Sequence, residues 1–425
     1  MATNNNYFDE WGINILYAAC VRSKPVGIRQ NTPGKGIMKK GIVNDSQRLF
    51  AVVLTACFVL AVCSPVFADP AEGVGEAGSV LLVDAYSGQV IFEKNADETV
   101  EFAGLKRLPA LLAVCRAFDE GAITPDSAVT VSEKAAGIRG ATAFLSANER
   151  ILADDVLKAA VILNAGDAVC TLIEAVFGNE AAALEEISRE LKGLGVGYVP
   201  EDALGGSSPI SARDIALIGM ELAKSEAYLK YSSVYLDSIT HENGSVTELT
   251  NPNRLVRHYS GCYGLATGSV GSSDYAGAFI ARRGNSAFLA VVSGMRSAAS
   301  RAKLASALLD HAFSSYRRVE LGAAGETVGA VLVSGGMLPS VEARTAAPVS
   351  ALVPVGDTKL TSYADLPEAI EAPVEEGALL GTLLIKNSAG ETIGEVPLVA
   401  SANVEKAGLV DIIVRIFRSF VHADK

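Results

Sequence analysis

The sequence has few of the residues that build metal centres, disulfide scaffolds or nucleic-acid interfaces. Its 425 residues include four histidines, six cysteines and one tryptophan, and the formal net charge is -12. The histidines show no metal-ligand spacing; they are His241, His258, His311 and His422. No two cysteines form a C-x-x-C pair, and no block of Lys and Arg accompanies the acidic charge. We therefore expect no metal, no cofactor and no nucleic-acid partner.

One apolar run near the N-terminus has the pattern of a cleavable secretory signal peptide, which we place at residues 38–68. Lys39 and Lys40 supply a positive start, and residues 49–62 are almost unbroken in apolar character. That run is too short to span a membrane comfortably. Residues 66–68 place small or permitted side chains where a signal peptidase cleaves. The pattern predicts export from a bacterial cell.

Two other interpretations of this run remain, a transmembrane anchor and a lipoprotein signal ending at Cys63. Because a signal peptide works from the N-terminus, we expect Met38 to be the true start and residues 1–37 to be an upstream extension. Residues 1–68 carry seven basic and three acidic residues, so the formal charge of residues 69–425 is -16.

Three cysteines follow the signal, and they are Cys115, Cys170 and Cys262. They are odd in number and far apart, so we interpret them as small buried apolar residues rather than as a disulfide framework. The proximity of Cys262 to His258 in the sequence leaves a Cys/His nucleophile as an alternative.

Hydrophobic periodicity predicts strands at both ends of residues 69–316 and helices between them. Hairpins are expected at residues 78–93 and 275–293, each with a glycine-containing turn. Apolar residues at helical spacing predict the intervening helices. Those segments are residues 108–118, 150–178, 180–192 and 211–224, with a further helix at 301–316. This order favours an α+β domain in which an antiparallel sheet carries a helical insertion.

The hydrophobic pattern of the sequence changes after residue 316. Short β-type runs separated by Gly and Pro predict a small all-β domain at residues 317–403, with a hairpin loop at residues 387–390. Residues 404–425 then form an amphipathic pattern with arginines on the polar face. Such a helix is expected to lie on the membrane surface. Packing on the protein's own domain is the alternative.

Several phrases of the sequence resemble the serine D-Ala-D-Ala carboxypeptidases, the low-molecular-weight penicillin-binding proteins of the peptidase S11 family. They are SVLLVDAYSGQVIFEKNAD, VTVSEKAAGI, SARDIALIGMEL and NPNRLVRHYSG, followed by APVEEGALLGTLLI and VPLVASANVEKAG. The resemblance implies a serine DD-peptidase/β-lactamase-like domain at residues 69–316, then the family's C-terminal β domain and its amphipathic anchor. It also implies work on the outer face of the cytoplasmic membrane or in the cell wall.

The first catalytic motif of this family is S-x-x-K, whose spacing stacks a serine and a lysine on one helix face. The amine can then take the hydroxyl proton. Aligned without gaps on the matching phrase, the serine position is Gly104 and the lysine position is Arg107. Glycine has no nucleophile, and a guanidinium stays protonated. Lys106 is adjacent but out of register.

The second and third motifs are S-x-N, for proton relay and substrate binding, and K-T-G, for the substrate's carboxylate. The second falls on Asn164 and Gly166, although Asp167 and Ala168 still match the family. The third falls on Ala266, with Thr267 and Gly268 retained. Five side chains that would do the chemistry are therefore replaced together.

The remaining polar residues allow two interpretations each. Arg107 either attracts an anionic ligand or forms an ion pair, and Asn164 binds either a peptide or a nearby loop. Thr267 and Gly268 either bind a peptide carboxylate or persist as strand residues. We expect a non-catalytic homologue that binds a peptidoglycan peptide or a cell-wall protein. The alternatives are an active carboxypeptidase that removes terminal D-alanine, and a structural module whose old cleft is filled.

Overall fold

The computed structural model describes residues 73–272, 274–356 and 359–408. The predicted signal peptide and the amphipathic segment from residue 409 onward lie outside the described residues. No helix in the described part of the chain has the length and apolar character needed to cross a membrane.

An antiparallel sheet forms the base of the first region, in the strand order β10-β11-β12-β1-β2, with β9 beside β11. The strands are β1 (Val80–Asp84), β2 (Val90–Lys94), β9 (Cys262–Gly264), β10 (Thr267–Val270), β11 (Asp274–Arg283) and β12 (Ser286–Met295). Both predicted hairpins are confirmed, because β1 pairs with β2 and β11 pairs with β12.

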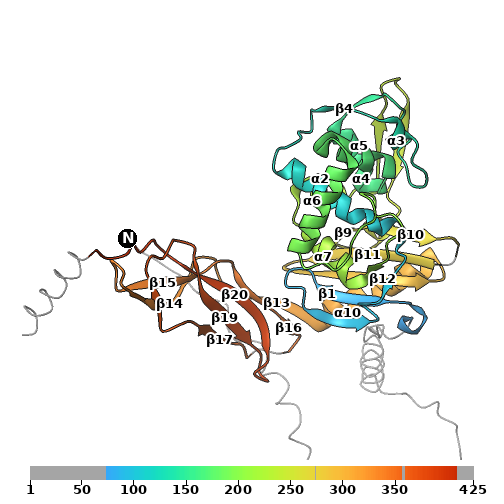
Figure 1. Cartoon of the computed structure of the whole chain (residues 1–425). Coiled ribbons are helices and arrows are strands. Elements are labelled where there is room, and N and C mark those ends of the chain that lie inside the picture. Colours follow the sequence, from blue (N-terminus) through green and yellow to red (C-terminus); the bar gives the residue numbers. More distant parts are fainter. Residues whose placement is uncertain (1–72, 273, 357–358, 409–425) are drawn as a thin grey trace, which may run out of the picture. The chain divides into compact units, whose positions relative to one another are not determined.

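Side chains alternate between the two faces of this sheet, and both faces are covered. Leu81 and Val83 of β1 belong to one core cluster with the helices of the insertion. Val80 and Leu82 belong to a second cluster with α10 (Ala298–Ser315). All five residues of β1 are therefore buried. Figure 1 shows the insertion on one side of the sheet and α10 on the other.

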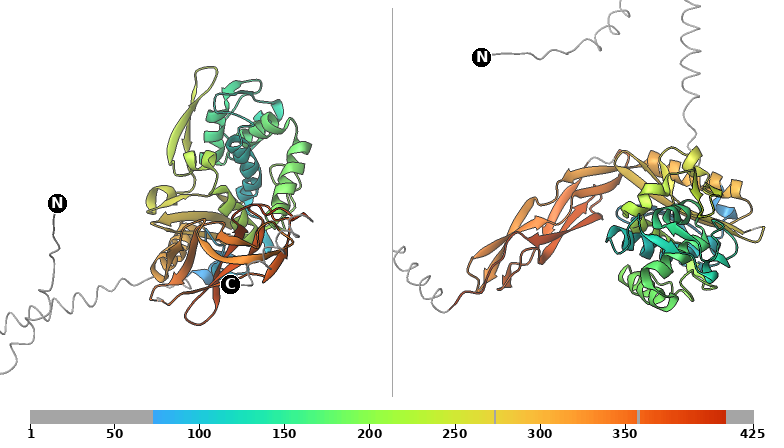
Figure 2. Two further views of the ribbon diagram at one scale, coloured as in Figure 1. Left: turned by 90° about the vertical axis from the view of Figure 1, so that its left-hand side faces the viewer. Right: turned by 90° about the horizontal axis from the view of Figure 1, so that it is seen from above.

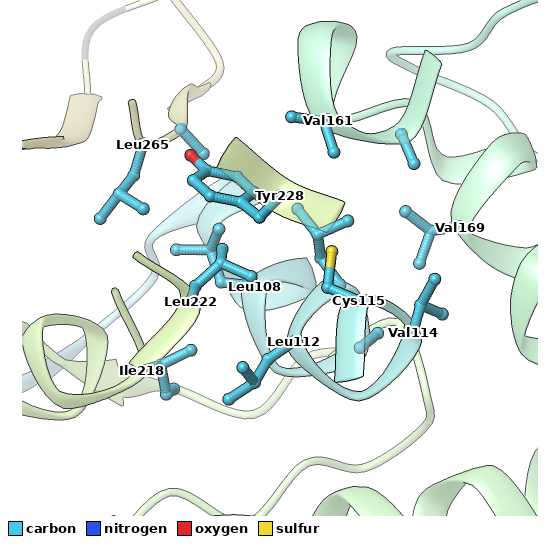
Figure 3. Packing of buried hydrophobic residues seen from close by; sticks show 14 of the residues in the cluster. Leu108, Leu112, Val114, Cys115, Val161, Val169, Ile218, Leu222, Tyr228 and Leu265 are labelled. Carbon is cyan, nitrogen blue, oxygen red and sulfur yellow. The ribbon is translucent and has the colours of Figure 1, made fainter. Parts of the chain in front are cut away.

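The insertion is mainly helical, as the sequence predicts. Its helices are α2 (Leu108–Asp119), α3 (Glu133–Ala136), α4 (Ala153–Leu163), α5 (Gly166–Phe177), α6 (Glu180–Gly193), α7 (Ala212–Leu222), α8 (Glu226–Ser232) and α9 (Leu255–His258). Ser211 caps α7 through its hydroxyl, which accepts a hydrogen bond from the N–H of Asp214. Leu112, Val169 and Leu222 come from three of these helices and share one core (Figure 3).

The three cysteines of the described residues are free and buried, which confirms their interpretation as packing residues. Cys115 lies inside the helical core (Figure 3), and burial raises its pKa well above the ordinary thiol value. Burial also raises the pKa of Cys170 to about 12 and that of Cys262 to about 11. His258 is exposed, whereas Cys262 is buried near the carbonyl of Gly264. The Cys/His alternative is therefore wrong.

The expectation of helix throughout residues 150–178 is wrong at two points. Arg150–Leu152 form strand β5, which pairs with β4 (Ala128–Thr130). Asn164 has a φ of 51° and separates α4 from α5. Asparagine tolerates this left-handed conformation better than most residues, so it ends one helix before the next begins.

Three short ladders in the insertion were not predicted by the sequence. One joins β4 to β5, another joins β3 (Thr99–Val100) to β6 (Ile210–Ser211), and the third joins β7 (Leu236–Thr240) to β8 (Val246–Thr250). The turn of the β7–β8 hairpin carries a buried histidine, His241.

Residues 316–404 form the expected all-β region with its own core, and the described residues there contain no helix (orange to red in Figure 2). Six strands follow the order β17-β19-β20-β15-β14-β18, and β13 pairs with β16. The strands are β13 (Tyr316–Gly322), β14 (Thr327–Ser334), β15 (Ser340–Thr345), β16 (Val349–Pro354), β17 (Thr361–Asp365), β18 (Ala369–Glu371), β19 (Leu379–Lys386) and β20 (Thr392–Ala400). Strands β19 and β20 flank the predicted 387–390 loop.

Candidate functional site

Gly104 lies in η2, a short 3-10 helix (Ala103–Arg107) that leads directly into α2. Its carbonyl oxygen accepts a hydrogen bond from the side-chain amide of Asn164, with an Nδ2–O distance of 2.7 Å. A Cβ atom built on Gly104 would lie 3.2 Å from that amide nitrogen and 3.9 Å from the carbonyl oxygen of Thr267. The segments that carry the three predicted motifs therefore meet at Gly104.

Asn164 is buried and bridges this centre. Its backbone carbonyl accepts a hydrogen bond from the guanidinium of Arg107, while its own amide donates to Gly104. The other amide atom, Oδ1, is buried and accepts no hydrogen bond from a described residue. Asn164 thus has one buried acceptor without a partner among the described residues, beside the position predicted for the nucleophile.

Arg107 is half-buried, and it makes no ion pair with a described residue. Burial lowers the pKa of its guanidinium, and the negative charge of Asp167 partly offsets that effect. The structure therefore shows no direct ion pair between Arg107 and a described carboxylate, such as one interpretation of this residue expected. Its charge remains in the site and is held there by a backbone carbonyl.

Gly166 is the first residue of α5, and its N–H donates to the carbonyl of Ala141 over 2.8 Å. A Cβ atom at this position would lie 2.8 Å from Cγ2 of Ile138 and 3.5 Å from Cζ of Arg107. The distance of 2.8 Å to Ile138 is shorter than the contacts that Cβ atoms make in protein structures. A side chain at residue 166 therefore requires Ile138 to move.

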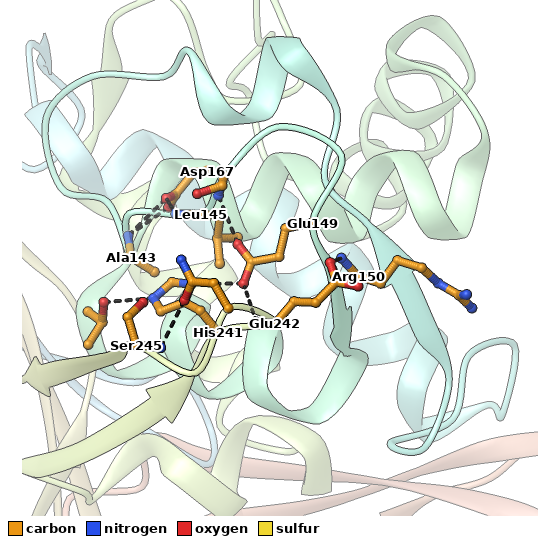
Figure 4. Close-up of polar contacts among 11 residues, drawn as sticks. Ala143, Leu145, Glu149, Arg150, Asp167, His241, Glu242 and Ser245 are labelled. Carbon is orange, nitrogen blue, oxygen red and sulfur yellow. Dashed lines mark hydrogen bonds and ion pairs between the residues drawn. The ribbon is translucent and has the colours of Figure 1, made fainter.

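Asp167 follows Gly166 and organises the neighbouring loop (Figure 4). Its carboxylate is 1 % exposed and accepts hydrogen bonds from the backbone N–H groups of Ala143, Leu145 and Ala168 at 2.9–3.1 Å. Such bonds satisfy a buried charge. The sequence marked Asp167 only as a match to the family, and the structure shows what it holds in place.

A second buried pair, Glu149 and His241, holds the far end of the same loop (Figure 4). Nδ1 of His241 lies 2.9 Å from Oε1 of Glu149, and its Nε2 lies 2.8 Å from the hydroxyl of Thr247. Burial would raise the pKa of Glu149, but hydrogen bonds from the N–H groups of Ser146 and Glu242 and from His241 outweigh it and hold that pKa below its ordinary value. His241 joins the β7–β8 hairpin to the loop.

The third predicted motif lies at the start of β10, the terminal strand of the sheet. Ala266 and Thr267 are buried, and Thr267 opposes Gly277 of β11. The carbonyl of Gly268 accepts a hydrogen bond from Nη1 of Arg301 over 3.1 Å. Gly268 is thus engaged by its own scaffold.

Arg301 is a buried cation on α10 that sequence reasoning missed. Its Nη1 also donates to the carbonyl of Ala276 over 3.0 Å, and burial lowers its pKa to about 10. Because both contacts are to strand carbonyls, Arg301 fastens the helix to the edge of the sheet.

Lys106 is bound away from the predicted motif positions. Its ammonium contacts the carboxylate of Glu101. Its Nζ also lies 2.5 Å from the carbonyl oxygen of Gly206. Both partners lie outside the three motif positions. In the part of the chain that is described, no group of three or more His, Cys, Asp or Glu residues could hold a metal ion.

Comparison with known families identifies the group to which this architecture belongs. Residues 68–297 match the family model described as D-alanyl-D-alanine carboxypeptidase, peptidase S11. The chain belongs to this family. Residues 316–406 match the model of the C-terminal domain of penicillin-binding protein 5. The α+β peptidase domain followed by a β-rich domain is therefore established, as is a family role in peptidoglycan metabolism.

Individual relatives agree with this assignment. The D-alanyl-D-alanine carboxypeptidase DacF of Bacillus subtilis is 29 % identical over 380 residues, which cover 87 % of this chain and 97 % of the relative. DacC of Escherichia coli is 26 % identical over 360 residues, covering 80 % and 88 % of the two chains. The structure of penicillin binding protein 5 from Haemophilus influenzae has a TM-score of 0.67 at 21 % identity, covering 78 % of this chain and 98 % of that one.

Proposed function

We propose that this chain is a non-catalytic homologue of the D-Ala-D-Ala carboxypeptidases that binds a peptidoglycan stem peptide in the old catalytic cleft. The observation that carries the proposal is the contact between Asn164 and Gly104. The amide nitrogen lies 3.2 Å from the point where a side chain at residue 104 would begin, and it donates to the carbonyl of that residue. A side chain at residue 104 would therefore crowd the amide of Asn164.

The groups for covalent chemistry are absent from the positions that should carry them. An acyl-enzyme needs an oxygen or sulfur nucleophile, and Gly104 offers neither. A general base must accept a proton, but the guanidinium of Arg107 stays protonated and donates to Asn164 instead. Gly166 supplies no side-chain amide to hold a substrate, and the side chain of Ala266 supplies no cation.

Features that bind rather than react are still present. Oδ1 of Asn164 is a buried acceptor without a partner among the described residues, so it can accept a hydrogen bond from a peptide N–H. Arg107 offers a positive charge to a carboxylate. Strand β10 is the edge of its sheet, where an extended peptide can add as a further strand.

The proposed place of action is the outer face of the bacterial cytoplasmic membrane or the cell wall. The signal-like segment at residues 38–68 and the amphipathic pattern at residues 404–425 support export and contact with a membrane surface. The cell-wall enzymes among its relatives support the same location. A cell-wall protein is the alternative ligand.

Labelling with a fluorescent penicillin tests the loss of catalysis. The purified chain should show no covalent band after denaturing electrophoresis, and it should release no D-alanine from a peptide that ends in D-Ala-D-Ala. A band that survives denaturation, or release of D-alanine, would establish the active alternative.

A matched variant shows whether the labelling assay can detect this scaffold at all. The substitutions Gly104→Ser, Arg107→Lys, Asn164→Ser, Gly166→Asn and Ala266→Lys restore the family motifs together. If the penicillin labels this variant but does not label the unmodified chain, the inactivity is assigned to these five positions. Calorimetric titration of the unmodified chain with the same peptide measures binding without chemistry, and an absence of heat would contradict the binding part of the proposal.

A further inference from the structure

Arg318 is a buried arginine that joins the all-β region to the first region of the chain. It lies on β13, and its guanidinium contacts the carboxylate of Asp84 at the end of β1. The side chain of Arg318 is 9 % exposed and that of Asp84 is 0 % exposed. This ion pair therefore connects two segments 234 residues apart and is shielded from water.

Further contacts from both regions orient the guanidinium. Nη1 of Arg318 donates to the hydroxyl of Ser350 on β16 over 2.7 Å. Its Cζ lies 4.6 Å from the centroid of the Tyr86 ring, which belongs to the β1–β2 turn. The backbone N–H of Arg318 donates to the hydroxyl of Ser286 on β12 over 3.1 Å. Arg318 is thus held at one position in the junction.

Asp84 is fixed on its own side of the junction. Its Oδ2 accepts hydrogen bonds from the N–H of Ser87 over 2.8 Å and from the hydroxyl of Ser87 over 2.5 Å. Two polar atoms of the pair, Oδ1 of Asp84 and Nε of Arg318, are buried without a hydrogen-bond partner among the described residues. The two charges therefore depend on each other for much of their compensation.

Apolar packing covers only part of this junction. Leu352 of β16 belongs to the core cluster of α10, and Tyr316 packs against the same cluster. A cavity of about 1040 Å³, lined by residues of both regions, lies beside these contacts. A second polar contact, 2.7 Å between Nδ2 of Asn285 and Oε1 of Glu320, joins exposed side chains. Two regions that share little apolar contact are expected to move relative to each other unless another contact prevents it.

The buried ion pair supplies such a contact. Burial removes water from both charges, so a pair of this kind adds little net stability compared with an apolar contact, and its best-attested role is to specify one arrangement. We propose that Arg318 and Asp84 form a latch that holds the all-β region in one fixed arrangement on the first region. The latch then sets the distance between the candidate site and residues 404–408. It is independent of the proposed function, because neither residue lies at a motif position.

Hydrogen–deuterium exchange of the full chain, measured by mass spectrometry, tests the latch. Arg318→Leu removes the cation and leaves the charge of Asp84 buried without a counter-charge, which is strongly unfavourable. We expect backbone exchange to become about 10-fold faster or more in peptides covering residues 84–90 and 316–322, one on each side of the junction. Exchange in α5 and in β19 and β20, which belong to separate cores, should not change.

Two further variants separate the charge from the shape of the pair. Asp84→Asn removes the charge and keeps an acceptor for Ser87, so it should reproduce the pattern of Arg318→Leu. The double variant should show less than the combined effect of the two substitutions, because both break one contact. Arg318→Lys keeps the charge without the planar fork and should give a smaller increase at the same peptides. It takes the place of Arg318→Leu if that variant does not fold.

The control is Arg344→Leu, which removes an arginine from an exposed ion pair with Glu342 on β15. It should leave exchange at the junction unchanged. Unchanged exchange at the junction after substitution of Arg318 would overturn the latch. An increase of the same size in every peptide would give Arg318 a general role in stability, and this also overturns the latch. Fully additive effects of the Asp84 and Arg318 substitutions would do the same, because the two residues would then act separately.

Discussion

Two adjacent residues at the start of α5 have opposite surroundings. Asp167 is buried and accepts hydrogen bonds from three backbone N–H groups, so its side chain is essential to the loop around it. Gly166 has no side chain, and the position of Ile138 leaves no room for one. Buried polar contacts thus hold the loop, whereas the neighbouring predicted motif position has no side chain.

This contrast teaches that the shape of the candidate site and its chemistry depend on different side chains. Asp167, Glu149 and His241 fix the loop through buried hydrogen bonds that involve no catalytic position. The family's architecture therefore does not depend on which side chains stand at the predicted motif positions. Substitutions in the framework should cost stability, and substitutions in the centre should cost little.

The largest expected effect is that of Asp167→Ala. It leaves the N–H groups of Ala143 and Leu145 without their acceptor, and both residues are buried. Unsatisfied buried donors cost 1–3 kcal/mol each, so we expect the free energy of unfolding to fall by about 3 kcal/mol. Urea denaturation measures it. Arg107→Ala, the control in the reaction centre, should cost about 1 kcal/mol, and an equal loss in both would remove the contrast.

The next effect concerns Glu149 and depends on pH. Its pKa in the folded chain lies below the ordinary value of a glutamate because three hydrogen bonds outweigh burial. A carboxyl with a depressed pKa stabilises the fold above its unfolded pKa, and this contribution is lost as the pH falls through the folded value. Stability should therefore decline below about pH 4.5.

Glu149→Gln removes the charge and keeps the shape of the side chain. It should cost about 2 kcal/mol near neutral pH, because bonds to charged groups are stronger than neutral ones. It should also flatten the decline of stability in acid. Thermal unfolding across pH 3–7 measures both. An unchanged acid profile would show that Glu149 does not contribute to it.

A smaller effect is expected for Gly166→Ala. The added Cβ atom would lie 2.8 Å from Cγ2 of Ile138, so one of the two must shift. Overpacking of this kind costs about 1–2 kcal/mol. The same substitution in an Ile138→Ala background should cost much less, because the contact has been removed. Equal costs in both backgrounds, measured by urea denaturation, would show that crowding does not keep this position a glycine.

The sequence predicts those parts of the fold that depend on near neighbours. The β1–β2 and β11–β12 hairpins follow from alternating patterns and a turn, and the cap of α7 follows from Ser211. The break at Asn164 could not be predicted from the apolar pattern, which continues through it on both sides.

The framework of the site was also beyond local reasoning. Asp167 finds its donors 22 and 24 residues away, and His241 finds Glu149 across 92 residues. No local pattern in one sequence records such pairings. The motif positions were reached through a family resemblance, and the structure then showed that Asn164 is hydrogen-bonded to both Gly104 and Arg107.

The smallest effect tests the contact on which the proposed function depends. Gly104→Ser places a Cβ atom 3.2 Å from Nδ2 of Asn164, a distance that a shift of a few tenths of an ångström would relieve. We expect a loss of about 0.5–1 kcal/mol in the unmodified background. Asn164→Gly keeps the positive φ and removes the amide, so Gly104→Ser should be nearly neutral beside it. A double-mutant cycle by urea denaturation gives the coupling directly. Zero coupling would mean that the amide of Asn164 does not crowd a side chain at residue 104. The proposed loss of catalysis would then depend on the missing side chain of residue 104 and not on its contact with Asn164.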